Sequence, residues 1–169
     1  TGWRTRFSLR GAAESLGSDL SFLQLQGSGK YILPLLGGRV LGRLEGGLSL
    51  MSNFEEMPTS FRFFAGGDNS VRGYDYEELG PMNDRGEVVG GRHLLAASLE
   101  YDYPVYKDYA LAVFYDVGNA FDNSSFTLKR SFGVGLRWRS PLGPIRLDLA
   151  FPDTSEQAFR IHLSMGPDL

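Results

Sequence analysis

The feature that most constrains this chain is an alternation of apolar and polar residues with a period of two. Successive side chains of a β-strand point to opposite faces, so this alternation is typical of strands with one apolar face. Eight segments show it, at about residues 3–13, 21–35, 39–51, 92–105, 109–118, 130–140, 144–152 and 158–166. The sequence therefore predicts an all-β, antiparallel fold of eight strands.

Composition supports this prediction and narrows the classes of function. The chain has 169 residues, enough for one domain over 1–169, and its 22 glycines, 12 phenylalanines and 8 tyrosines suit twisted strands better than helices. It has no cysteine, so disulfides and thiolate sites are excluded. With 17 basic and 20 acidic residues and no basic run, it lacks the charge pattern of a nucleic-acid-binding protein.

Two architectures produce such alternation: a soluble sheet with a packed core, and a membrane barrel with its apolar face in lipid. The predicted connections alternate between short and long. Those at 36–38, 106–108 and 140–144 are short, whereas those at 12–21, 52–91, 118–130 and 152–158 are longer. This rhythm is typical of an outer-membrane barrel, with tight turns at one end and longer loops at the other. The soluble all-β domain remains the alternative.

If the chain crosses a membrane, we expect it to do so with β-strands. No apolar stretch approaches the ~20 residues that a membrane-spanning helix needs. The chain opens on Thr1-Gly2-Trp3 without a charged and then apolar leader, so we expect that any targeting segment has been removed.

The long connection at 52–91 contains an unusual motif, Val71-Arg72-Gly73-Tyr74. A guanidinium held away from bulk water is costly unless carboxylates meet it, and its planar fork matches a carboxylate. Glu100 and Asp116 lie on the polar phase of two neighbouring strand segments, so both side chains are expected to face the same interior. They are candidate partners for Arg72. The alternative is that Arg72 only caps a solvated loop.

Four stretches carry a resemblance to a known family: FFAGGDNSVRGYDYEELGP, ASLEYDYPV, AVFYDVGNAF and GVGLRWRSPLGPIRLDLAFP. In this order and spacing they resemble the carboxy-terminal barrel half of the outer-membrane assembly and translocation family, which includes BamA and TamA. The closing GPDL favours the TamA branch. The resemblance runs from about Phe61 to Leu169. Members of that family carry periplasmic POTRA domains and sixteen strands, and this chain has room for only the last eight strands.

The resemblance implies roles for particular residues. In this family the arginine of the loop motif folds back into the barrel and meets acids on two strands, which implies a contact of Arg72 with Glu100 and Asp116. Gly73 would allow close approach, and Tyr74 would pack as a wedge. A barrel of this kind opens laterally at weakly paired edge strands, so the last strand is the expected gate strand, with Phe159, Ile161, Leu163 and Met165.

The implied function is insertion or translocation of other outer-membrane proteins in the bacterial outer membrane. The expected partners are outer-membrane lipid, nascent barrel or autotransporter clients, a periplasmic or inner-membrane partner subunit, and a second copy of this segment. A two-partner-type secretion transporter and a passive porin-like barrel are the alternatives. Neither metal, cofactor nor catalysis is expected. The histidines lack metal-ligand spacing and the acid pairs lie in the long loop, at His93, His162, Glu55-Glu56 and Glu77-Glu78.

The size of the long loop conflicts with a closed barrel of eight strands. Such a barrel has an interior that its own wall side chains fill, and the segment 52–91 is far larger than the space left. We therefore expect one of two arrangements for the chain alone. Either two copies form a sixteen-stranded wall, or eight strands close on themselves and expel the loop that carries Arg72.

Overall fold

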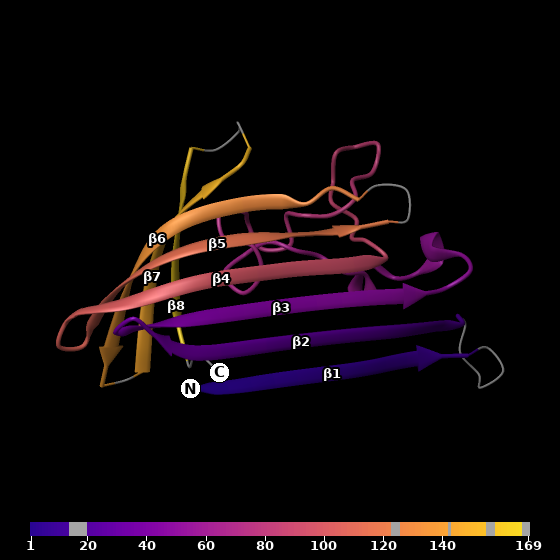
Figure 1. The fold of residues 1–169 in the computed structure, drawn as a ribbon. Coiled ribbons are helices and arrows are strands. Elements are labelled where there is room, and N and C mark those ends of the chain that lie inside the picture. The colour runs from indigo at the N-terminus through magenta and orange to yellow at the C-terminus, as the bar shows by residue number, and fades with distance from the viewer. Residues whose placement is uncertain (14–19, 123–125, 142, 155–157, 167–169) are drawn as a thin grey trace.

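The computed structural model describes residues 1–13, 20–122, 126–141, 143–154 and 158–166, and it folds into one antiparallel sheet (Figure 1). Each strand pairs with its neighbours in the sequence, in the order β1 to β8. The strands are β1 (Gly2–Ala12), β2 (Phe22–Leu35), β3 (Gly38–Leu50), β4 (His93–Tyr106), β5 (Tyr109–Phe121), β6 (Lys129–Ser140), β7 (Gly143–Pro152) and β8 (Arg160–Met165). The predicted all-β fold with eight antiparallel strands is confirmed.

Some strand ends differ from the expected positions. β5 continues to Phe121, because its last residues still pair with the start of β4 at His93. β8 begins only at Arg160, so Phe159, which we assigned to the gate strand, lies before it. Pro152 has no N–H to donate to a ladder, and the last residue of β7 that pairs with β8 is Ala150.

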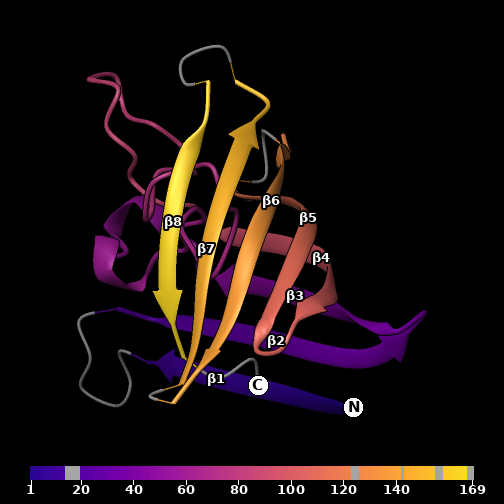
Figure 2. The ribbon, with the colours of Figure 1, turned by 90° about the vertical axis from the view of Figure 1, so that its left-hand side faces the viewer.

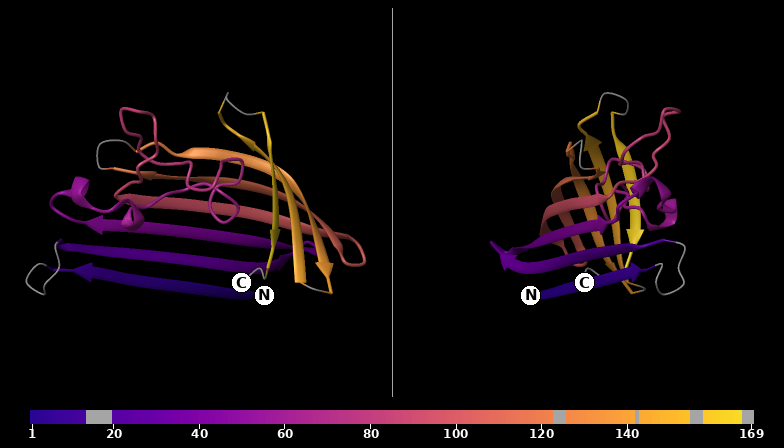
Figure 3. Two further views of the ribbon diagram at one scale, coloured as in Figure 1. Left: turned by 180° about the vertical axis from the view of Figure 1, so that it is seen from behind. Right: turned by 90° about the vertical axis from the view of Figure 1, so that its right-hand side faces the viewer.

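The sheet is an open, curved wall. β1 to β4 run side by side, while β7 and β8 turn upward and cross in front of β1 and β2 at a steep angle (Figure 2). Within the described residues β1 and β8 are the two ends of the sheet and do not pair with each other. The connection between β3 and β4 lies on the concave side of this wall (Figure 3). The expected alternative of a closed eight-stranded barrel that expels this loop is therefore wrong.

The opposite face of the sheet is apolar and exposed. Along β5, Leu111, Val113 and Tyr115 are each about half exposed, while the residues between them are buried. The same alternation leaves Ile161, Leu163 and Met165 of β8 more than half exposed. A continuous apolar face of this size suits lipid rather than water. The helices among the described residues are two short 3-10 turns, η2 (Phe54–Glu56) and η3 (Thr59–Phe61), and neither is long and apolar enough to cross a membrane.

Two tight turns set the pairing of the strands they connect. Leu36 and Gly37 between β2 and β3 both have positive φ, 49° and 80°. Two-residue hairpin turns of this kind match the natural twist of the strands. Lys107, between β4 and β5, also has positive φ. These turns lie at the end of the sheet opposite to the long loop, as the alternation of connection lengths predicts.

Candidate functional site

The long loop, residues 51–92, is fixed on the concave face by its own small core. Isolated bridges join Phe63 to Gly91 and Ala65 to Leu79. An apolar cluster then packs loop residues against the start of β4 and the end of β5, and its members are Phe63, Ala65, Val71, Tyr74, Leu79, Leu94 and Ala120. Val71 is completely buried in this cluster. Its burial places the next residue, Arg72, directly above β4 and β5.

Arg72 is the centre of a buried ionic cluster. Its Nε and Nη2 donate to the two carboxylate oxygens of Asp116, at 2.8 and 3.0 Å, and its backbone N–H donates to the same carboxylate at 3.1 Å. Nη1 donates to Glu100 at 2.6 Å and to Asp148 at 3.1 Å. Arg72 is 5% exposed and Asp116 is fully buried. The loop is thus joined to β4, β5 and β7 through one side chain.

A second arginine completes the cluster from the sheet itself. Arg137 on β6 donates from Nε to Glu100 at 3.0 Å and from Nη1 to Asp148 at 2.6 Å. Glu100 and Asp148 therefore each lie between two guanidinium groups. Carboxylates shared in this way balance the charge of both arginines away from bulk water, which lowers the cost of burying these ions. We call Arg72, Glu100, Asp116, Arg137 and Asp148 the arginine cluster.

Local sequence makes space for this cluster. The guanidinium of Arg72 lies over the ring of Phe114, 3.5 Å from its centroid, which adds a cation–π attraction. A Cβ at Gly133 would meet that ring at 2.3 Å, and a Cβ at Gly135 would meet Oδ1 of Asp148 at 2.0 Å. The GVG sequence of β6 therefore leaves room for an aromatic ring and a carboxylate on the concave side.

Gly73 has a backbone that other residues rarely adopt. Its φ is +95°, and a Cβ there would lie 3.2 Å from the side chain of Ser131 and 3.3 Å from the backbone of Pro152. Glycine reaches this conformation without a steric penalty. The residue after Arg72 must therefore be small for the loop to lie this close to β6 and β7.

The charge of Arg72 is stabilised in place. Burial alone would lower the pKa of its guanidinium. The hydrogen bond and charge of Asp116, together with the charges of Glu100 and Asp148, outweigh burial and raise that pKa above its ordinary value. Arg72 therefore stays positively charged and holds the loop to the wall through its hydrogen bonds. It does not transfer its protons to another group.

The loop also contacts the last hairpin, β7–β8. Tyr74 is buried and its hydroxyl donates to Asp153 at 2.5 Å, just after β7. The backbone N–H of Gly73 donates to Nε2 of His162 on β8 at 2.8 Å, and Nδ1 of the same ring contacts Asp68. Burial and the neighbouring Asp153 carboxylate raise the pKa of Tyr74, which keeps its hydroxyl protonated as the donor. The last hairpin is thus attached to the loop at several points.

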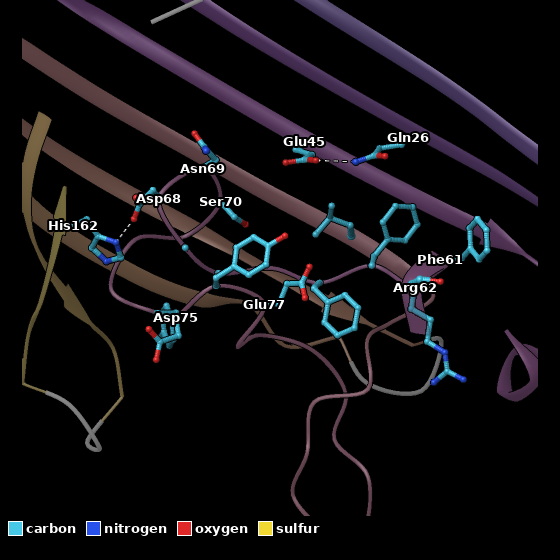
Figure 4. Close-up of a pocket in the computed structure, with 18 of the residues that line it drawn as sticks. Gln26, Glu45, Phe61, Arg62, Asp68, Asn69, Ser70, Asp75, Glu77 and His162 are labelled. Carbon is cyan, nitrogen blue, oxygen red and sulfur yellow. Dashed lines mark hydrogen bonds and ion pairs between the residues drawn. The ribbon is translucent and has the colours of Figure 1, made fainter. Parts of the chain in front are cut away.

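A polar cavity of about 580 Å³ remains beside the loop, between β1–β3 on one side and β8 on the other. Figure 4 shows Asp68 and His162 on one side of it and the hydrogen-bonded pair Gln26 and Glu45 on the other. Arg160 of β8 also lines it and forms an ion pair with Asp75 of the loop. The cavity separates the two unpaired ends of the sheet, so they do not share a packed interface.

The structure brings together the residues that sequence patterns singled out and adds others. Arg72, Glu100 and Asp116 meet, Gly73 allows close approach, and Tyr74 packs in the loop core with its hydroxyl on Asp153. Sequence reasoning missed Asp148 and the bridging role of Arg137. Both lie on the polar phase of their strands, which is the signal that could have found them. Sequence reasoning also gave no role to His162. Its partner Asp68 is 94 residues away in the sequence.

Comparison with known proteins identifies the family. The model of the Omp85 superfamily domain matches residues 1–168. The chain belongs to the Omp85 superfamily. This Omp85 domain is 34% identical over 138 residues to the outer membrane protein assembly factor BamA of Nitratidesulfovibrio vulgaris, covering 74% of this chain and 17% of that protein. It is 32% identical over 152 residues to the chloroplastic outer envelope protein 80 of Arabidopsis thaliana, covering 83% and 18%.

The fold agrees with this assignment. The crystal structure of BamA from Haemophilus ducreyi lacking POTRA domains 1–3 superimposes with a TM-score of 0.77 at 21% identity, covering 96% of this chain and 37% of that one. The predicted membership in the family of BamA and TamA is confirmed, and so is the outer-membrane location. This Omp85 domain spans less than a fifth of either curated relative. The TamA branch stays a prediction, because the family model and the relatives named BamA do not test it. Residues 167–169 of GPDL also lie outside the described residues.

Proposed function

We propose that this Omp85 domain is the C-terminal wall of an assembly factor that helps insert or translocate other outer-membrane proteins. Its relatives include two proteins named as the outer membrane protein assembly factor BamA, from Nitratidesulfovibrio vulgaris and from Neisseria meningitidis. The observation that carries the proposal is the arginine cluster, in which Arg72 of the long loop reaches Asp116 and Glu100.

The mechanism we infer uses the difference between the strands that the arginine cluster holds and the outer edge of β8, with which no strand pairs among the described residues. The arginine cluster ties β4, β5, β6 and β7 to the loop. Among the residues that the structure describes, β8 pairs with β7 through six residue pairs, from Ile145↔Met165 to Ala150↔Arg160. Unpaired strand edges present N–H and C=O groups that can template another strand. Phe159, just before β8, and Ile161, Leu163 and Met165 within it would keep the gate in contact with lipid while an incoming strand pairs along its edge.

This function implies several partners. Outer-membrane lipid contacts the apolar face, and nascent barrel proteins or autotransporters are the clients. In the full-length protein a periplasmic or inner-membrane subunit delivers those clients or supplies the driving force. A second copy of this segment, or further strands of the same barrel, would complete the wall between β1 and β8.

Reconstitution tests the function directly. The full chain in lipid vesicles should accelerate folding of a urea-unfolded outer-membrane barrel, measured by its heat-modifiable migration on gels. Arg72→Ala should reduce this acceleration, and Arg85→Ala, in an exposed turn of the same loop, should not. Vesicles that gain steady ion conductance without faster client folding would favour the porin-like barrel. Export of a two-partner secretion substrate without barrel insertion would favour the transporter.

A further inference from the structure

His162 occupies a special position among the contacts between the loop and the wall. It is the residue of β8 that touches the arginine-bearing motif itself, because its Nε2 lies 2.8 Å from the backbone nitrogen of Gly73. Its Nδ1 contacts the carboxylate of Asp68, which precedes Gly73 in the same loop. The ring is 8% exposed. One side chain of the last strand is therefore held between two points of the loop.

The geometry fixes the protonation state of this ring. A backbone N–H can only donate, so Nε2 of His162 must accept and cannot carry a proton. In the neutral ring the proton is then on Nδ1, from which it is donated to Asp68. A second proton on Nε2 would point at the N–H of Gly73 and replace an attraction with a repulsion. The contact with Gly73 exists only while the imidazole is neutral.

Charged groups surround His162 on the loop, on β7 and on its own strand. Asp148 is its direct partner across β7 and β8. The neighbouring carboxylates are Asp68, Asp75 and Asp148. The cations that contact these residues or adjoin them in the strands are Arg43, Arg72, Arg146 and Arg160. Asp148 is already bonded to Arg72 and Arg137. A positive charge on His162 would therefore lie among paired ions, with Asp68 as its remaining direct partner.

We propose that His162 is a pH-sensitive latch between the last strand and the loop motif. When the ring is neutral, it holds β8 to Gly73. When the ring is protonated, this bond is lost while the ring keeps Asp68. The bonds of Arg72 do not involve His162, so the loop stays on the wall. Only the attachment of β8 to Gly73 is released, while Arg160 of β8 keeps its ion pair with Asp75. This inference goes beyond the proposed function, because the latch can be observed without any client protein.

Two substitutions test separately the contact of His162 with Gly73 and its contact with Asp68. His162→Gln places a neutral acceptor at the same number of bonds from Cα as Nε2, so it can accept from Gly73 and does not titrate. His162→Asn places a neutral donor at the position of Nδ1, so it can reach Asp68 but not Gly73. Both variants leave the arginine cluster unchanged. They therefore distinguish loss of the latch from loss of the fold.

Hydrogen exchange of the Gly73 amide in lipid nanodiscs, using the full chain, tests the proposal. Between about pH 7.5 and about pH 5, its protection factor should fall about tenfold, as expected for losing one hydrogen bond. In His162→Gln it should stay high at both values, and in His162→Asn it should be low at both. Amides at the centre of β5 should not change.

A second measurement reads the ring itself. The chain has two histidines, so 15N-histidine labelling together with His93→Gln leaves the signal of His162 alone. We expect a neutral ring with its proton on Nδ1 at the higher pH and a doubly protonated ring at the lower pH. A proton on Nε2 at the higher pH would overturn the proposal. Equal loss of Gly73 protection in wild type and His162→Gln would overturn it as well.

Discussion

Arg72 and Asp116 lie 44 residues apart in the sequence and meet through three hydrogen bonds, two from the guanidinium and one from the backbone N–H of Arg72. The guanidinium bonds fix the plane of the side chain, and the backbone bond fixes the position of the loop itself. Asp116 is fully buried, so neither group can exchange its partner for water. The placement of the whole loop thus depends on this pair more than on any single apolar contact.

The first prediction concerns removal of this arginine. Arg72→Ala leaves Asp116 and Glu100 buried with fewer cations, which should lower the free energy of unfolding by about 3–5 kcal/mol. Urea unfolding in vesicles should show this lower free energy of unfolding. On gels, less of the unheated variant should migrate as the folded form. Arg72→Lys keeps the charge but not the planar, forked guanidinium. Its free energy of unfolding should therefore lie between those of wild type and Arg72→Ala. An Arg72→Ala protein as stable as Arg85→Ala would contradict the role of the cluster.

The second prediction uses two glycines with similar backbones. Gly73 and Gly86 both have positive φ, +95° and +78°, but a Cβ at Gly73 meets Ser131 and Pro152, whereas a Cβ at Gly86 meets nothing within 4 Å. Both alanine substitutions carry the backbone strain, on the order of 1 kcal/mol. Only Gly73→Ala should also make the loop accessible to protease. Equal cleavage of the two variants would show that close approach at Gly73 is unimportant.

The third prediction concerns the attachment of the loop to the end of β7. Tyr74→Phe removes the hydroxyl that donates to Asp153 and leaves the ring in the apolar cluster. Because Asp153 is exposed, the cost should be modest, about 0.5–1.5 kcal/mol. Tyr76→Phe is the matched control, since Tyr76 is 81% exposed. The measurement is again urea unfolding, and identical midpoints for the two variants would count against the Tyr74 contact.

Sequence patterns predicted the wall well because a strand has a simple period. The alternation around Glu100 and Asp116 placed both acids on one face, and the structure has them there. Asp148 lies on the same face but was not assigned to the cluster. Its role depends on the register that sets it opposite Gly135, where the missing side chain leaves room. Register between distant strands cannot be read from the period of either strand alone.

Other features depend on contacts that no local pattern contains. His162 has neither metal-ligand spacing nor a nearby acid in the sequence, yet the fold brings Asp68 and Gly73 to its two nitrogens. The late start of β8 follows from where β7 stops pairing, at Ala150. The open sheet likewise involves the contacts of a long loop on its concave side, which no strand period describes. The loop and the cavity beside it lie between β1–β3 and β8.

The fourth prediction concerns the isolated chain. Its sheet has two unpaired ends within the described residues, and backbone groups left unpaired in lipid are costly. Two copies can pair the first strand of each with the last strand of the other, which satisfies both ends. Mass measurement in detergent should therefore show a dimer whose long loop resists protease. A monomer whose loop is cleaved would contradict this pairing of two copies.

The most direct test of the central claim is a double-mutant cycle between Arg72 and Asp116. Urea unfolding in vesicles gives the free energies of wild type, Arg72→Ala, Asp116→Asn and the double variant. Residues in direct, buried contact are strongly coupled, so we predict an interaction energy of at least about 2 kcal/mol. Effects that add to within about 0.5 kcal/mol would mean that the two residues act independently. That result would contradict a loop held to the barrel wall by this pair.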